Sequence, residues 1–486
     1  MKLVSRLILA IMLILAAGIL ILGPKPDENV PPGRIVVDYW EKWSGIEGAQ
    51  MQQIVDWFNE TVGREKNIFV RYLAIAQVDR KTLTATAAGV PPDIAGLWQR
   101  DLVSMASRNA LTPLDEFARE HGIDQSAYKP VFWKMCSHDG RLYSLVSTPA
   151  TMALHFNRRA MLQSADQLRA AGVDPFQAPR SIAEFDRWAE ALDLRDERGN
   201  IRRAGYVPME PGWYISLTPY WFGGRLWDPA RGEFYFTDPR TIQAFEWIQS
   251  YPRRLGKAAL ADFSSAAGGF GTPNSPFIAG TVGGVLQGPW MGNYTFNLRP
   301  AMSEWVVPKS IELFLPRAAR QFNYEWAVEA FPSVDPVSLP DVTFADADLL
   351  MIPQGARHPR QAFEFIAFLQ RQDVMERLNS LHCKPSPLSR VSDDFIRRHP
   401  NPYIAVHERL ARSSNAWPQI ASPIQAEIGA ELELAVQQVY LLEKTPAQAL
   451  AELTDRARGK YQRFVERQSL RGRMAPRAVT AVGGQP

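Results

Sequence analysis

The chain has 486 residues, of which 46% are hydrophobic and 22% are charged. This length corresponds to two or three domains, and the composition excludes a disordered, collagen-like or multi-span membrane protein. The 54 basic and 51 acidic residues give a formal net charge of +3, which excludes a strongly basic nucleic-acid binder, so we expect no nucleic-acid partner.

An apolar segment from Leu7 to Leu22 follows Lys2 and Arg6 and ends before Pro24. It is slightly longer than the apolar region of most signal peptides and slightly shorter than a comfortable membrane span, so it predicts either a cleaved signal sequence or a retained hydrophobic helix. We assign residues 1–33 to this segment and a short tether. The basic residues before it place the rest of the chain outside the cytoplasm, in a periplasmic or extracytoplasmic location, where residues 7–22 tether it to the inner membrane unless they are removed.

The next hundred residues alternate between strand and helix patterns. Strands are predicted at 35–40, 68–74 and 93–98, and helices are predicted after Ser44, where Glu47 completes a capping box, and at 82–88. This βαβαβ order predicts an α/β protein with a parallel sheet.

Helical patterns dominate the middle of the chain and its end. Helices are predicted after Asn157, after the capping box of Ser181 and Glu184, and from Asp238, with a hairpin near 234–236 and a strand at 284–286. Further elements are predicted at 348–352, from Pro359, from Pro423 to Glu443, and after the capping box of Thr445 and Gln448. The polar, aperiodic residues 471–486 are predicted to be a disordered tail.

No strong catalytic motif or metal-binding spacing is present. The seven histidines are scattered, and Asp346 and Asp348 lack the companion residues of a calcium loop. We therefore expect no catalytic residues, no metal and no cofactor. Cys136 and Cys383 leave two alternatives, inert thiols or one disulfide.

Aromatic side chains beside polar ones recur where strands lead into helices. In an open α/β sheet such junctions converge on one ligand site, and aromatic faces with carboxylates suit a neutral polyhydroxylated ligand. Core packing is the alternative role for each tryptophan alone. The candidate ligand-binding residues are Trp43, Glu47, Trp98, Asp101, Glu210, Trp213, Tyr214, Trp290 and Asp346.

A series of short motifs covers most of the chain in a characteristic order. They are Tyr39-Trp40, Gly89–Ile94, Leu111–Asp115, Asp139–Leu145, Phe156-Asn157, Gly223–Asp228, Phe277–Gly280, Gly288–Trp290, Pro359–Leu369 and Thr445–Leu450. In this order and spacing, the chain resembles the extracellular family 1 solute-binding proteins of ABC importers, the sugar-binding group that includes maltose-binding protein.

The resemblance implies a two-lobe periplasmic-binding-protein fold of type II, with a ligand cleft between the lobes. It implies an N-terminal lobe of residues 34–146 and 331–379, and a C-terminal lobe of 147–330 and 380–470. It also implies that Trp98, Asp101, Glu210, Trp213 and Trp290 contact a saccharide. Ala150 and Thr151 stand where the family has an acid, so the sugar need not be a maltodextrin.

The function expected from this resemblance is capture of a saccharide or related polyol by a monomeric protein that delivers it to the transmembrane permease subunits of an ABC importer. Two alternatives remain open at this point. One is a secreted glycosidase or lyase that uses Glu47 or Glu210 as acid and Asp101 as its partner. The other is a membrane-tethered sensor of the same ligand. Cys136 and Cys383 both fall near the expected hinge, where a disulfide between them would limit lobe opening.

Overall fold

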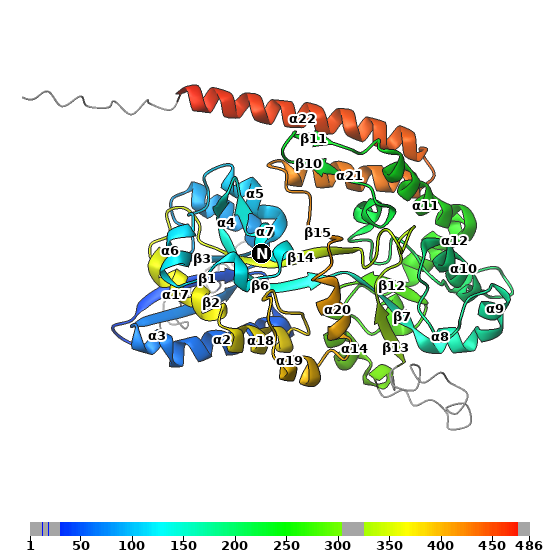
Figure 1. The fold of residues 1–486 in the computed structure, drawn as a ribbon, viewed down its shortest axis with the longest axis horizontal. Coiled ribbons are helices and arrows are strands. Elements are labelled where there is room, and N and C mark those ends of the chain that lie inside the picture. The colour runs from blue at the N-terminus through cyan, green and yellow to red at the C-terminus, as the bar shows by residue number, and fades with distance from the viewer. Residues whose placement is uncertain (1–11, 13–17, 19–29, 304–324, 475–486) are drawn as a thin grey trace, which may run out of the picture.

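The computed structural model describes residues 12, 18, 30–303 and 325–474, and its elements form two lobes, each around its own hydrophobic core (Figure 1). The predicted N-terminal hydrophobic helix lies outside the described residues, apart from positions 12 and 18. The two-lobe α/β fold expected from the sequence is confirmed.

The first lobe is built on a sheet that has six strands among the described residues. They are β1 (Ile35–Glu41), β2 (Ile68–Ala74), β3 (Ile94–Trp98), β6 (Ser144–Thr151), β14 (Thr343–Met351) and β15 (Ala416–Trp417). β1 lies between β2 and β3 and is parallel to both, as the βαβαβ pattern predicts. β14 runs antiparallel to β3, and β6 pairs with β14.

Helices cover this sheet because their apolar residues recur at helical spacing. In α2 (Gly45–Glu60), Met51, Ile54, Val55 and Phe58 are fully buried. Ser44 occupies the N-cap position of α2, but its side chain makes no capping hydrogen bond, so the capping box predicted there is wrong. The other helical elements of this lobe are α3 (Val62–Glu65), α4 (Val78–Ala87), α5 (Gln99–Ala106), α6 (Asp115–Glu120), η1 (Gln125–Ala127), α7 (Pro130–Met135), α17 (Pro359–Leu369) and α18 (Gln372–Leu381).

The second lobe contains an antiparallel sheet in which β7 (Ala153–Asn157) lies between β12 (Gly284–Gln287) and β13 (Trp326–Glu329). Around it pack α8 (Arg158–Gln163), α9 (Ala165–Ala170), α10 (Ile182–Leu192), η2 (Ile215–Phe222), α11 (Pro239–Leu255), α12 (Lys257–Ala266), α13 (Pro276–Ala279), α14 (Met291–Leu298), η3 (Pro300–Ser303) and α20 (Ile404–Leu410). α19 (Asp393–Arg398) precedes α20 in the chain.

Short hairpins occur in both lobes. They join β4 (Ser137–His138) to β5 (Arg141–Leu142), β8 (Leu194–Arg195) to β9 (Ile201–Arg203), and β10 (Trp227–Asp228) to β11 (Glu233–Phe234).

Two of the predicted helix starts are confirmed in detail. Ser181 caps α10 by accepting a hydrogen bond from the backbone N–H of Glu184. Thr445 and Gln448 bond reciprocally before α22 (Pro446–Met474): the N–H of Gln448 donates to Thr445 Oγ1, and the N–H of Thr445 donates to Gln448 Oε1.

The strands β6 and β14 connect the lobes, and their pairing shifts register between Asp348 and Leu349 (Figure 1). Along β14, Phe344 packs in the second core, whereas the residues from Ala345 onward pack in the first. The lobe boundary expected at residue 331 therefore lies farther along the chain. Phe331 and Val342 stay with the second lobe because they pack around Trp221, whose Nε1 donates to the carbonyl of Val342.

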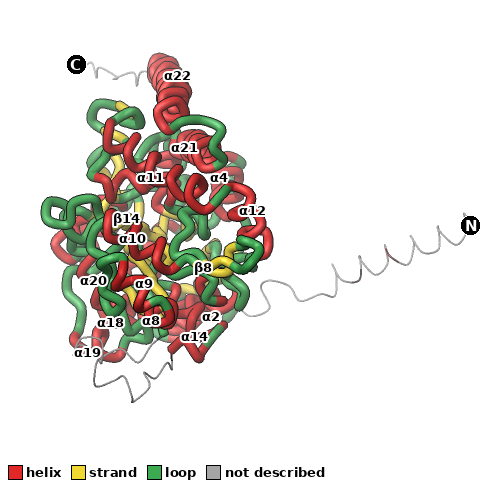
Figure 2. The backbone as a smooth tube through the Cα atoms, turned by 90° about the vertical axis from the view of Figure 1, so that its right-hand side faces the viewer, coloured by secondary structure: helices red, strands yellow, loops and turns green. Residues whose placement is uncertain are grey.

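The last two helices, α21 (Gln425–Tyr440) and α22, pack together at one end of the molecule (Figure 2). Both contribute to the second core, but each also reaches the first lobe: α21 packs against α5, and Gln468 Nε2 of α22 donates to the carbonyl of Ser107 at 3.0 Å. The disordered tail predicted from residue 471 is wrong for residues 471–474, because α22 continues to Met474, and no proline occurs between Pro446 and Pro476. The rest of the predicted tail lies outside the described residues.

Candidate ligand-binding site

A cavity of about 690 Å³ lies between the lobes, and side chains of both lobes line it. It is bordered by the carboxyl ends of β1 and β3, by the crossing strands β6 and β14, and by the start of α14. We call it the aromatic pocket. Seven of the nine candidate ligand-binding residues line it: Trp43, Glu47, Trp98, Trp213, Tyr214, Trp290 and Asp346.

Two of these tryptophans stand at the starts of helices. Trp98 is the N-cap residue of α5 directly after β3, and Trp290 is the N-cap residue of α14 shortly after β12. Neither helix start has a side-chain cap. The first-turn N–H groups are therefore not satisfied by capping side chains, and donors of this kind suit hydroxyl or carboxylate oxygens.

The ring of Trp290 is fixed by its neighbours. Its Nε1 donates to Gln287 Oε1 at 2.9 Å. Its six-membered ring lies so close to Gly288 that a Cβ added there would be 2.4 Å from a ring atom. The absence of a Cβ at Gly288 thus allows the ring to approach the backbone closely.

A second group of aromatic side chains lines the same pocket. Trp213 is 51% exposed, and its ring contacts that of Phe270 at a centroid distance of 4.5 Å. Phe270 in turn contacts Tyr294 at 4.8 Å. An exposed tryptophan supported by other rings offers a flat apolar face to a ligand.

The floor of the pocket is a charge network. Lys42 Nζ lies 2.9 Å from Glu41 Oε1 and 3.0 Å from Asp348 Oδ1, and Lys384 Nζ lies 2.9 Å from Asp348 Oδ2. Thr148 donates to Asp348 Oδ2 at 2.6 Å. Every charge in this buried group has an opposite charge within hydrogen-bonding distance, as buried ions require.

Lys384 also lies between aromatic rings of the two lobes. Its Nζ is 5.1 Å from the ring centroid of Trp43 and 5.6 Å from that of Trp290. These distances allow cation–π attraction to both rings. Lys384 therefore connects the charged floor to the aromatic walls.

The two aspartates of β14 have opposite pKa shifts. Burial alone would raise the pKa of Asp348, but the ammonium groups of Lys384 and Lys42 outweigh it and hold that pKa well below its usual range. Burial, followed by the nearby charge of Asp348, raises the pKa of Asp346 to about 7. At neutral pH, Asp346 can therefore either donate or accept a hydrogen bond.

The structure does not place Asp101 and Glu210 in the aromatic pocket. Asp101 lines a neighbouring cavity of about 750 Å³, which we call the side chamber, and burial raises its pKa to about 6. Glu210 lines neither cavity, although its neighbours Met209 and Pro211 line the side chamber. Burial raises the pKa of Glu210 to about 7.

The model of one protein family matches residues 53–386, and its description is bacterial extracellular solute-binding protein. This chain belongs to that family. The match includes β14 and much of both lobes. The solute-binding protein has no match among the curated proteins compared with it.

Solved structures with the same fold include other binding proteins. CpMnBP1 with mannotriose bound is 22% identical, with a TM-score of 0.70 over 87% of this chain and 100% of that one. The GacH receptor of Streptomyces glaucescens, solved without ligand and with acarbose, is 16% identical, with a TM-score of 0.63 over 88% and 98%. UgpB of Mycobacterium tuberculosis with glycerophosphocholine is 18% identical, with a TM-score of 0.65 over 89% and 100%.

Sequence reasoning missed Lys42, Phe270 and Lys384 as residues of the solute-binding protein's pocket. Lys42 directly follows β1, so the rule that placed Trp98 at the end of β3 could have found it. Lys384 follows α18 and, like Lys42, pairs with Asp348 of β14, although the three residues are far apart in the sequence. No local pattern signals that contact.

The disulfide between Cys136 and Cys383 is not formed, and both cysteines are free and buried. The Sγ of Cys136 donates to the carbonyl of Phe132 within the first core, whereas the Sγ of Cys383 donates to Asn293 Oδ1. Each thiol is thus packed against different elements. Within the part of the chain that the structure describes, no group of His, Cys, Asp or Glu side chains could hold a metal ion.

None of the helices in residues 12, 18, 30–303 and 325–474 is both long enough and apolar enough to cross a membrane. The predicted segment 7–22 falls outside these residues except at 12 and 18.

Proposed function

We propose that this solute-binding protein captures a saccharide or related polyol in the aromatic pocket and delivers it to the permease subunits of an ABC importer. The observation that carries the proposal is the set of aromatic residues contributed by both lobes around a charged floor. The apolar faces of a sugar ring can pack against Trp98 and Trp290, while Glu47 and Lys384 bond its hydroxyl groups.

Closure of the lobes follows from this arrangement. A ligand that contacts tryptophans of both lobes binds the closed state more tightly than the open one, and it shifts the population toward closure. The structural relatives support the ligand class, since two of those described above were solved with mannotriose or acarbose. In this proposal the protein acts as a monomer, and the apolar segment at 7–22 directs its export or tethers it to the inner membrane.

The proposed enzyme alternative has less support. It requires Asp101 to act beside Glu47 or Glu210, but only Glu47 of these three lines the aromatic pocket. A glycosidase needs two carboxyl groups flanking one bond. This separation favours binding over hydrolysis.

Thermal unfolding of the purified protein with a panel of saccharides, polyols and sugar phosphates tests the proposal. A binding protein shows saturable stabilisation, because a ligand of the native state adds RT ln(1 + [L]/Kd) to the free energy of unfolding. Thin-layer chromatography of the same mixtures should show the sugar unchanged. New product spots would instead support the enzyme alternative, and no stabilisation by any saccharide or polyol would contradict the proposed ligand class.

A further inference from the structure

A larger cavity of about 980 Å³ also lies between the lobes, and we call it the rear chamber. The first lobe contributes residues of α5, α7 and the β4–β5 hairpin. The second lobe contributes Trp227, the segment 418–423 and residues of α22. Neither the family match nor the candidate residues from the sequence assign this cavity a role.

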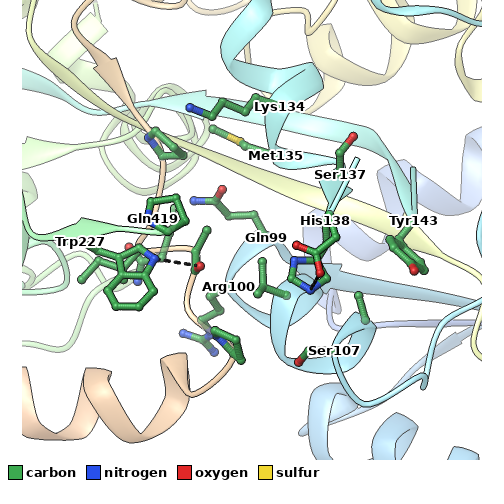
Figure 3. Close-up of a pocket in the computed structure, with 18 of the residues that line it drawn as sticks. Gln99, Arg100, Ser107, Lys134, Met135, Ser137, His138, Tyr143, Trp227 and Gln419 are labelled. Atoms are coloured by element: carbon green, nitrogen blue, oxygen red, sulfur yellow. Dashed lines mark hydrogen bonds and ion pairs between the residues drawn. The ribbon is translucent and has the colours of Figure 1, made fainter. Parts of the chain in front are cut away.

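Polar groups without partners face the rear chamber. Gln99 is only 8% exposed, and its Nε2 has no hydrogen-bond partner among the described residues. Gln419 also lines the chamber and has a buried Oε1 without a partner in the same part of the chain. Figure 3 shows the Gln99 amide amid the lining side chains, with Gln419 and Trp227 to one side and His138 and Tyr143 to the other. Leaving a buried amide unpaired is costly, so this geometry favours a hydrogen-bonding ligand.

The chamber also has aromatic faces from both lobes. Tyr143 and Trp133 line it from the first lobe, and Trp227 and Tyr461 line it from the second. Trp227 is held in place because its Nε1 donates to the carbonyl of Ala421 at 3.2 Å (Figure 3). Its ring also packs edge-on against Tyr461. Both cavities are thus lined by aromatic rings from the two lobes together with polar side chains.

Two side chains are shared by all three cavities. Arg100 and Gln419 line the aromatic pocket, the side chamber and the rear chamber. The guanidinium of Arg100 lies 4.5 Å from the ring centroid of Trp98, and half of its side chain is exposed. The aromatic pocket and the rear chamber therefore share these two side chains in their linings.

We propose that the rear chamber holds the distal rings of an oligosaccharide whose other end lies in the aromatic pocket. This proposal rests on the proposed function and specifies its substrate as an extended saccharide rather than a single sugar. Gln99 and Gln419 bond hydroxyl groups of the distal rings, and Trp227 packs against a ring face. Arg100 contacts the ligand where it passes between the two cavities.

Calorimetric titration with two series of sugars tests this proposal, one from mannobiose to mannohexaose and one from maltose to maltoheptaose. In at least one series, the longest sugars should bind the wild-type protein about tenfold or more tightly than the disaccharide. Gln99→Leu and Trp227→Leu should each remove most of this gain and leave disaccharide binding unchanged. Gln167→Leu, at an exposed position of α9, is the matched control and should change neither value.

The other outcomes separate this proposal from the proposed function. If the affinity does not depend on sugar length, the rear-chamber proposal alone is overturned. The same holds if the Gln99→Leu and Trp227→Leu proteins melt normally but keep the full dependence of affinity on sugar length. If both variants weaken the binding of the disaccharide and of the long sugars equally, these residues have a structural role and the rear-chamber proposal is overturned. Failure of both series to bind overturns the rear-chamber proposal, whereas the proposed function is contradicted only if no saccharide or polyol stabilises the protein.

Discussion

At the scale of single residues, Trp290 owes its position to two neighbours, Gln287 and Gly288, rather than to deep burial. We expect Trp290→Ala to weaken binding of the best-stabilising saccharide by about 1–3 kcal/mol, because a contact with the ligand is lost while the core stays filled. Calorimetry measures the loss, and thermal unfolding should still show a cooperative transition. Gly288→Ala should also weaken binding, since its Cβ displaces the ring. A Trp290→Ala protein without a melting transition would show that the residue is structural.

The protonation of Asp346 gives a second prediction at this scale. Its pKa of about 7 in the folded protein exceeds the value near 3.9 of an unfolded chain, so the folded state binds more protons between about pH 4 and pH 7. The free energy of unfolding contributed by Asp346 therefore falls as pH rises through this window.

Asp346→Asn removes that linkage. The stability of the variant relative to the wild type should increase from about pH 4 to pH 7 and then level off. Urea denaturation at a series of pH values measures the difference, and contributions from other titrating groups cancel in it. A difference that stays constant with pH would mean that Asp346 keeps an ordinary pKa.

At the scale of secondary-structure elements, two similar capping sequences behave differently. Thr445 bonds the first turn of α22, whereas the side chain of Ser44 makes no capping bond at α2. Thr445→Ala should therefore lower the free energy of unfolding by about 1 kcal/mol, and Ser44→Ala should change it far less. Urea denaturation of the two variants checks this pair. Equal losses would contradict the assignment of the caps.

The crossing strands show where element-scale prediction from sequence succeeds and where it fails. The first βαβαβ unit was predictable because each strand and helix has its own hydrophobic period and adjoins its partners in the chain. β14 switches from one core to the other at Ala345, and no change in its apolar pattern marks that switch. The predicted lobe boundary at residue 331 therefore lies before the position where β14 passes from one lobe to the other.

At the scale of the whole molecule, the cysteines provide a test of how the lobes are joined. Burial raises the pKa of both thiols to about 12, so neither should react quickly with a thiol reagent in the folded protein at neutral pH. After denaturation without reductant, both Cys136 and Cys383 should titrate as free thiols. Absence of free thiols would show a disulfide and contradict the structure.

The candidate site also contains residues that the neighbouring sequence predicts and residues that it does not. Trp43, Trp98 and Trp290 could be predicted because each adjoins the end of its own strand. Asp101 and Glu210 were expected beside them from the resemblance, but the turn of α5 and the path of the chain near Met209 direct them elsewhere. Lys384 and the rear chamber depend on contacts between distant segments, which the sequence pattern does not reveal.

The path of β14 also has a consequence for biosynthesis. The first core needs residues from Ala345 to Leu378, which are made only after the segment that builds most of the second lobe. The second core in turn needs α21 and the start of α22, near the end of the chain. Neither lobe can therefore complete its core while the ribosome is still translating the middle of the chain.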